Sequence, residues 1–335
     1  MTNPADPMSP QMRQIARRMP NFTINARTIQ LSRQFMGGLT KAPRWALEFV
    51  AKWVMKAPLI PPDIRINDTV ISGQDRSQIR LRIYQPRQVP PGSPVLLWMH
   101  GGGYVMGTPE QDDFYVRPFI QEAGLVVVSV DYRLAPEHPF PLPLEDCYAA
   151  LQWLTAAARS LGINPELIAI GGNSAGAGLA AALAQLACDR GEIHPVFQLL
   201  VYPMLDDRTS AEAAAAAKSH LVWNHASNRF GWESYLGQPC GAAIAPAGAV
   251  AARRVSLAEL PPAWIGVGSN DLFHDEATTY ARRLNAAGVN CELVTVPGAF
   301  HGFDLFAPEM QVVREFRQAQ VSALKKALTI GPRRL

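Results

Sequence analysis

The chain has 335 residues, of which 48% are hydrophobic and 18% charged, and its formal net charge at pH 7 is +3. This composition is typical of a folded globular protein and excludes a disordered chain. A net charge this small gives no reason to expect nucleic acid or a membrane surface as a partner, and we predict neither.

The targeting and cysteine signals favour the cytoplasm. The first thirty residues contain four prolines and no apolar core of signal-peptide length. No run approaches the roughly 20 apolar residues of a membrane span, so none is predicted. The spacing of the cysteines fits neither a zinc site nor a disulfide framework, and free thiols are expected at Cys147, Cys188, Cys240 and Cys291. We therefore predict a cytoplasmic protein without a bound metal.

The elements begin with helical patterns over residues 1–58, which contain no strand. Beyond them, apolar runs of strand length alternate with helical segments. Strands are predicted at 64–71, 79–84, 95–99, 126–130, 167–170, 197–201, 264–267 and 292–296. Helices are predicted at 144–160, 175–188, 275–287 and about 309–328.

This alternation predicts an α/β fold, a mostly parallel central sheet with helices on both faces. The short turn at 73–77 predicts an antiparallel hairpin of the first two strands at one edge. We assign residues 59–335 to a catalytic domain. We interpret residues 1–58 as a helical cap segment, with 205–236 as a cap insertion. The alternative, that this helical material only packs against a sheet edge, stays open.

The stretch IAIGGNSAGAGLAAAL, residues 168–183, joins a buried strand to a helix through a glycine-rich serine turn. The GxSxG pattern at 172–176 in this context is typical of a nucleophile elbow, which exposes the hydroxyl of Ser174. Gly172 and Gly176 remove side chains where strand and helix pass closely. The Ala175 amide, at the helix start, favours negative charge nearby.

A serine hydroxyl needs a base and an orienting carboxylate. Loops beyond the carboxyl ends of parallel strands offer His301 and His274 as the base. We favour His301, because Gly302 leaves room beside it and the chain order matches an α/β-hydrolase. Among the carboxylates at 270–276 we favour Asp271, which lies closest to the preceding strand. Asp275 and Glu276 suit the first turn of a helix instead.

The glycines of HGGGY, residues 100–104, follow the predicted strand at 95–99. Backbone amides without side chains can approach a developing oxyanion, so Gly102, Gly103 and Ala175 are the predicted oxyanion hole. A flexible loop or a phosphate-binding loop is the alternative. No Lys-Ser/Thr and no GxGxxG pattern supports the phosphate alternative.

These motifs together resemble the hormone-sensitive lipase family of α/β-hydrolases, the bacterial family IV esterases. The motifs that carry the resemblance are HGGGY at 100–104, DYRLAPEHPFP at 131–141, GNSAG at 172–176, NDLFHDE at 270–276 and HGF at 301–303. The resemblance implies a carboxylesterase with a helical cap and no cofactor. It also implies the triad Ser174, His301 and Asp271. His100 and the carboxylates and arginine of the second motif, Asp131, Arg133 and Glu137, would brace the active-site loops.

The expected partner is a small-molecule ester of short to medium acyl length. The expected substrate-binding residues are Tyr104, Asn173, Met204, Leu205, Trp223 and Phe35. The alternatives are a non-catalytic binding protein on the same fold, and an amidase or lactonase with the same triad. A homodimer is common in such families, although no residue pattern here defines an interface.

The chain departs from the family pattern at three places. Asn173 precedes the serine where Asp or Thr is usual, and Ala177–Gly178 replaces Gly-Asn. Leu272 and Phe273 follow the acid where Pro-Leu is common. None of these changes removes a group that the chemistry needs, but they alter the surroundings of the serine and the acid.

Overall fold

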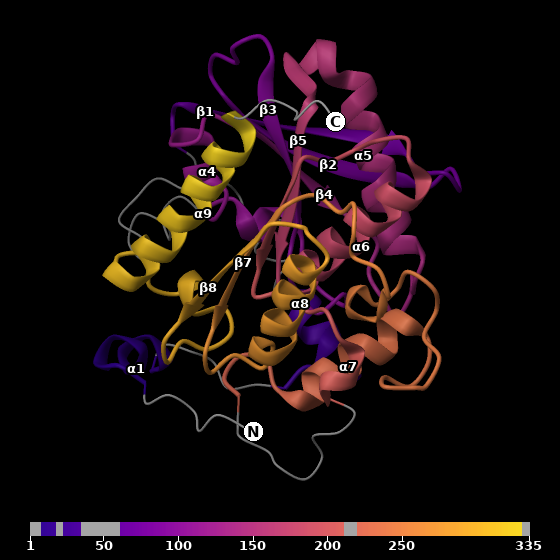
Figure 1. Cartoon of the computed structure of the whole chain (residues 1–335), viewed down its shortest axis with the longest axis vertical. Coiled ribbons are helices and arrows are strands. Elements are labelled where there is room, and N and C mark those ends of the chain that lie inside the picture. Colours follow the sequence, from indigo (N-terminus) through magenta and orange to yellow (C-terminus); the bar gives the residue numbers. More distant parts are fainter. Residues whose placement is uncertain (1–7, 18–22, 35–60, 211–219, 330–335) are drawn as a thin grey trace.

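The computed structural model describes residues 8–17, 23–34, 61–210 and 220–329. Within them, eight strands form one sheet in the order β1-β2-β4-β3-β5-β6-β7-β8. The strands are β1 Ile64–Ser72, β2 Gln78–Pro86, β3 Ser93–Met99, β4 Val126–Asp131, β5 Ile163–Asn173, β6 Phe197–Val201, β7 Ala263–Gly268 and β8 Cys291–Val296. Figure 1 shows this sheet as the central layer of the molecule.

The sheet is mostly parallel, as predicted. Strands β1 and β2 form the expected antiparallel hairpin, and β2 also pairs antiparallel with β4. All other neighbours are parallel. Strands β6 and β7 are buried along their whole length, since helices cover both faces of a parallel sheet.

Helices cover the two faces of the sheet (Figure 1). Helices α4 and α9 contact each other on one side, and α5 and α6 contact each other on the other. The α-helices that lie wholly within the described residues are α1 Pro10–Ala16, α4 Arg117–Gln121, α5 Leu142–Leu161, α6 Ala175–Arg190, α7 His225–Leu236, α8 His274–Ala286 and α9 Gln311–Thr329. In the described part of the chain, no helix combines the length and apolarity required to cross a membrane.

All eight predicted strands are present, and the predicted α/β fold with a mostly parallel central sheet is confirmed. Several strands extend beyond their predicted ranges, and the largest difference is in β5, which spans Ile163–Asn173 rather than residues 167–170. Its first residues pair with β3 through an irregular register between Ser93 and Val95. Residues 164–166, Asn-Pro-Glu, are half-buried or exposed and lack the apolar run that marks a buried strand.

The predicted cap consists of residues 1–58 and the insertion 205–236, which contains α7. Residues 23–34 lie beside α7 (Figure 1). The Ile24 amide donates to Ser227 Oγ at 2.9 Å, and Asn224 Nδ2 donates to Thr23 Oγ1 at 3.0 Å. Residues 23–34 therefore contact the 220–236 segment directly. The division into a cap and a catalytic domain stays a prediction, and much of it, residues 35–58 and 211–219, lies outside the described residues.

Strand β5 and helix α6 pass each other so closely at the serine turn that only glycine fits. A Cβ atom on Gly176 would lie 2.0 Å from the Met99 carbonyl oxygen and 2.5 Å from that of His100. A Cβ atom on Gly172 would lie 2.5 Å from the Met99 oxygen. These obstacles are backbone atoms, so no side chain can move away to relieve the clash. The ends of β3 and β5 and the start of α6 are thereby fixed against one another.

We predict that Gly176→Ala destabilises the protein by about 3 kcal/mol or more, because the methyl group collides with two carbonyls. The control is Gly191→Ala at the end of α6, where an added Cβ meets no atom within 4 Å and only the positive φ of 65° opposes it. That control should cost about 1 kcal/mol. Urea unfolding measures both, and equal losses would contradict the predicted steric conflict.

Candidate active site

Ser174 lies on a sharp turn between β5 and α6, with φ 56° and ψ −120°. A positive φ is strained for a residue with a side chain, so the surrounding structure must hold it. The Ser174 amide donates to the Val201 carbonyl at 2.9 Å, and its carbonyl accepts from the amides of Gly178 and Met204 at 3.0 and 3.1 Å. The turn is thus fixed to the end of β6 and to the first turn of α6.

The side chains of Ser174, His301 and Asp271 form a chain of hydrogen bonds. His301 Nε2 lies 2.9 Å from Ser174 Oγ. His301 Nδ1 lies 2.9 and 3.1 Å from the two carboxylate oxygens of Asp271. With the ring proton on Nδ1, facing the carboxylate, Nε2 is left to accept the serine proton. All three residues are more than 90% buried, which strengthens these electrostatic contacts.

Two aromatic rings hold the imidazole of His301 edge-on. The ring of Tyr202 lies 4.8 Å away at an interplanar angle of 69°, and that of Phe273 lies 5.1 Å away at 89°. Phe273 is one of the departures from the family pattern. Neither contact was predictable from the sequence, since no motif or spacing marks Tyr202 or Phe273 as a neighbour of His301. Their packing restricts the rotation of the imidazole.

The glycine loop after β3 is braced through its first glycine. The Gly101 carbonyl accepts from Gln111 Nε2 at 3.1 Å and lies 2.9 Å from His100 Nδ1. Burial lowers the pKa of His100, so its ring is neutral and donates this bond. His100 thus contacts the loop at the place expected of a brace. Gln111 was not singled out by the sequence analysis.

The loop then turns through two left-handed residues, Gly102 at φ 128° and Gly103 at φ 62°. The Gly102 carbonyl accepts from the amides of Val105 and Met106 at 3.1 and 3.0 Å. Within the described residues, the amides of Gly102, Gly103 and Ala175 donate to no protein acceptor. Three donors without protein partners, next to a buried serine, are chemically suited to bind an oxyanion.

The residues predicted to bind substrate lie close to this loop, but most are enclosed by packing. Tyr104 stacks on Tyr235 at 4.2 Å and donates its hydroxyl to the Met204 carbonyl at 3.1 Å. Met204 and Leu205 are fully buried. The Leu205 amide donates to a carboxylate oxygen of Glu276 at 2.7 Å, an anchor for the segment after β6 that the sequence analysis did not predict. Phe35 lies outside the described residues.

Trp223, another of the predicted pocket residues, lies against the glycine loop. A Cβ atom on Gly103 would lie 2.1 Å from the Trp223 ring, so the indole packs directly on the glycine loop. Its Nε1 donates to Asn228 Oδ1 at 3.1 Å, and Asn228 Nδ2 donates to Ser210 Oγ at 2.8 Å. These bonds fix the orientation of the ring.

The DYRLAPEHPFP stretch is held by ion pairs, and one of them involves an arginine that also contacts the chain just beyond the glycine loop. Arg133 pairs with Asp146, and Asp131 pairs with Arg80. Glu137 pairs with Arg33, whose guanidinium also donates to the Val105 and Ala135 carbonyls at 2.7 Å. Arg33 therefore connects the N-terminal segment to the chain just beyond the glycine loop.

Asp112 is a buried carboxyl group beneath the site that the sequence analysis did not predict. It accepts from Trp98 Nε1 at 2.8 Å and from Asn173 Nδ2 at 3.3 Å. Burial raises the pKa of Asp112 to about 7, and its hydrogen bonds only partly oppose that shift. In the sequence, Asp112 is one of three acidic residues after the glycine loop, Glu110, Asp112 and Asp113, and no pattern marks it as the one without a cationic partner.

The raised pKa of Asp112 predicts a pH-dependent stability. A carboxyl group whose pKa rises on folding stabilises the folded state below its unfolded pKa, and that contribution is lost as the pH rises to about 7. In Asp112→Asn the side chain at this position does not titrate, so the variant does not lose this stability as the pH rises. We therefore expect the unfolding free energy of the variant, relative to wild type, to rise by about 2–3 kcal/mol between pH 5 and pH 8. Urea unfolding at both pH values measures it, and a constant difference would contradict the prediction.

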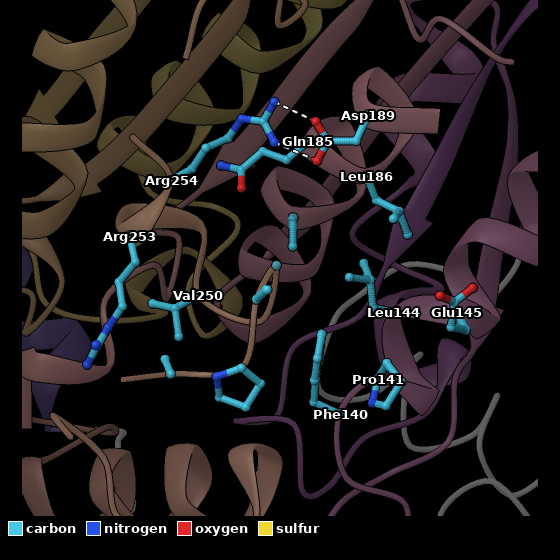
Figure 2. Close-up of a pocket in the computed structure, with 15 residues that line it drawn as sticks. Phe140, Pro141, Leu144, Glu145, Gln185, Leu186, Asp189, Val250, Arg253 and Arg254 are labelled. Carbon is cyan, nitrogen blue, oxygen red and sulfur yellow. Dashed lines mark hydrogen bonds and ion pairs between the residues drawn. The ribbon is translucent and has the colours of Figure 1, made fainter. Parts of the chain in front are cut away.

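A cavity of about 470 Å³ lies apart from these residues, between α5, α6 and the loop before β7 (Figure 2). It is lined by apolar side chains such as Leu144 and Val250 and by the amide of Gln185. The lining cations Arg253 and Arg254 are already paired with carboxylates, Arg254 with Asp189 as drawn in Figure 2. None of the predicted site residues lines this cavity, so it is separate from the candidate active site.

Residues 96–305 match the family model described as the alpha/beta hydrolase fold. The chain is 35% identical to the carboxylesterase NlhH of Mycobacterium tuberculosis, over 81% of this chain and 85% of that protein. It is 37% identical to the esterase LipI of the same organism, over 80% of this chain and 84% of that protein. The structure of esterase LipW from Mycobacterium marinum is similar with a TM-score of 0.81 and 32% identity, covering 96% of each chain.

Proposed function

Since the chain belongs to the hormone-sensitive lipase family of α/β-hydrolases, we propose that it is a serine carboxylesterase in which Ser174, His301 and Asp271 form the catalytic triad. The similar proteins are named carboxylesterases and esterases, and the chain is accordingly a carboxylic ester hydrolase. The observation that carries the triad is the chain of hydrogen bonds from the strained serine through the imidazole to the buried carboxylate.

In the first step, Ser174 Oγ attacks the ester carbonyl carbon while His301 Nε2 takes the serine proton. The Asp271 carboxylate holds the ring orientation and stabilises the imidazolium that forms. The protonated imidazole then gives its proton to the leaving alcohol, and the acyl group stays on the serine. In the second step, His301 takes a proton from water, and the resulting attack frees the acid.

The amides of Gly102, Gly103 and Ala175 are the proposed donors to the oxyanion in both steps. They have no protein acceptor among the described residues, and their positions are fixed by the glycine loop and the start of α6. Donors fixed in place need no reorganisation when charge develops on the carbonyl oxygen. Each such donor contributes about 3 kcal/mol of transition-state stabilisation.

A chromogenic ester assay tests the triad. Ser174→Ala should lower kcat with p-nitrophenyl butyrate by at least about 10⁴-fold, because alanine lacks the oxygen that attacks the ester. His301→Ala should lower it by a similar factor, since the two residues act as one unit. Thermal unfolding of each variant checks that the fold is intact. Turnover by Ser174→Ala equal to wild type would overturn the assignment, and an inactive wild type would favour a binding protein.

The acyl preference follows from the enclosed surroundings of the serine. Trp223 packs on the glycine loop and Met204 and Leu205 are fully buried, which limits the room beside the proposed oxyanion donors. We propose short to medium acyl chains as substrates.

A graded series of p-nitrophenyl esters from acetate to palmitate, kept below their micelle concentrations, tests this preference. We expect kcat/KM for the butyrate ester to exceed that for the palmitate ester by about tenfold or more, since lost contacts of a few kcal/mol correspond to such factors. Trp223→Ala opens space at the glycine loop and should therefore lower the ratio of kcat/KM for the butyrate ester to kcat/KM for the palmitate ester. Faster hydrolysis of palmitate by the wild type would contradict the proposal.

A further inference from the structure

We propose that Asp112 is a positioning residue for the nucleophile and that it acts through Asn173, the residue immediately before Ser174. The inference rests on the proposed function, in which Ser174 attacks the ester. Asp112 ends the short 3-10 helix η1, Pro109–Asp112, which follows the glycine loop. The proposed chemistry makes no use of this carboxyl group, so its burial requires another explanation.

Burying a carboxyl group without a cation is costly, and Asp112 is only 1% exposed. Among the described residues, no arginine, lysine or histidine forms an ion pair with it. The neighbouring carboxylates do have such partners, Asp113 with Arg82 and Glu110 with Arg80. Asp112 alone in η1 is directed at neutral donors, Trp98 and Asn173. A buried acid held this way is expected where its position matters more than the stability that it contributes.

The two donors come from β3 and β5, the strands that lead into the glycine loop and into Ser174. Trp98 is near the end of β3, immediately before the glycine loop, and Asn173 is the last residue of β5, immediately before the serine. The Asp112 carboxyl group thus connects the ends of β3 and β5 through these two hydrogen bonds. A shift of one strand end relative to the other would break one of the two bonds.

Asn173 is also held on its other side. Its Oδ1 atom is buried and accepts no hydrogen bond from the described residues. A Cβ atom on Gly101 would lie 2.8 Å from that oxygen, so the amide fills the space beneath the glycine loop. The preceding residue of η1, Gln111, donates to the Gly101 carbonyl at 3.1 Å. Neighbouring residues of η1 therefore hold the glycine loop and the residue before the nucleophile.

The consequence is a fixed distance between the nucleophile and the proposed oxyanion donors. The hydrogen bond works in one direction only, because Asn173 Nδ2 donates and Asp112 accepts. If the two residue types are exchanged, the amide at 112 donates to the carboxylate at 173, so a hydrogen bond is kept with its direction reversed. Changing only one of them does not. This asymmetry makes the proposal testable without altering the volume of either side chain.

The experiment is a double-mutant cycle of Asn173→Asp, Asp112→Asn and both together, assayed at pH 8 with p-nitrophenyl butyrate. In Asn173→Asp two carboxylates face each other, and we expect kcat to fall about 10–100-fold with KM within about twofold, as for a misplaced nucleophile. In Asp112→Asn one amide oxygen must serve two donors, and kcat should fall several-fold. The exchanged protein should return to within about threefold of wild type.

The rate at which a small phosphonate ester labels Ser174 provides a second measurement, because it reports the nucleophile without the later hydrolysis step. This labelling rate should fall in the variants in which kcat falls and recover in the exchanged protein. Thermal unfolding shows whether each variant is folded at the assay temperature. If Asn173→Asp alone does not fold, the comparison of Asp112→Asn with the exchanged protein still decides, since the added Asn173→Asp must then raise kcat.

Asn290→Asp, the same chemical change at an exposed position, is the matched control and should leave kcat unchanged. The proposal is overturned if Asn173→Asp keeps its kcat within twofold of wild type, or if the exchanged protein is no faster than the slower single variant. Either failure leaves the ester hydrolysis by Ser174 intact, whereas activity in Ser174→Ala would remove the proposed function itself.

Discussion

The close passage of β5, α6 and the end of β3 is the constraint on which the site depends. Gly172 and Gly176 lie against backbone carbonyls, which forces the chain at Ser174 into a left-handed conformation between them. The hydroxyl then projects from the turn instead of lying along a helix. Because the obstacles are backbone atoms, the geometry does not depend on the rotamer of any neighbour. Every other group of the site is positioned relative to this turn.

Parallel strands bring the remaining groups to the same place. The glycine loop follows β3, Asp271 follows β7 and His301 follows β8, and the carboxyl ends of these strands lie at one edge of the sheet. The sheet was predictable from sequence because a buried parallel strand is an apolar run, and the proposed triad was chosen from motifs that stand in a fixed order along the chain. The hydrogen bonds of Ser174, His301 and Asp271 join residues that this reasoning had already chosen.

The supporting contacts could not be predicted in the same way. Asp112 and Asn173 are 61 residues apart, and Glu276 holds an amide 71 residues away. A carboxyl group that becomes buried looks the same in sequence as one on the surface, so local patterns assigned Glu276 only to a helix start. The start of β5 was not predicted either, because its exposed residues and irregular pairing with β3 leave no periodic signal in the sequence.

Arg33 ties a segment near the amino terminus to two carbonyls beside the glycine loop and to Glu137. A multidentate contact of this kind makes that early segment part of the framework that surrounds the reaction, although it is remote along the chain. Exchanging amino-terminal segments between relatives to change their substrate range would therefore succeed only if the incoming segment carries a guanidinium at the corresponding place. Replacement of the amino-terminal segment of this enzyme has to keep the contacts that Arg33 makes.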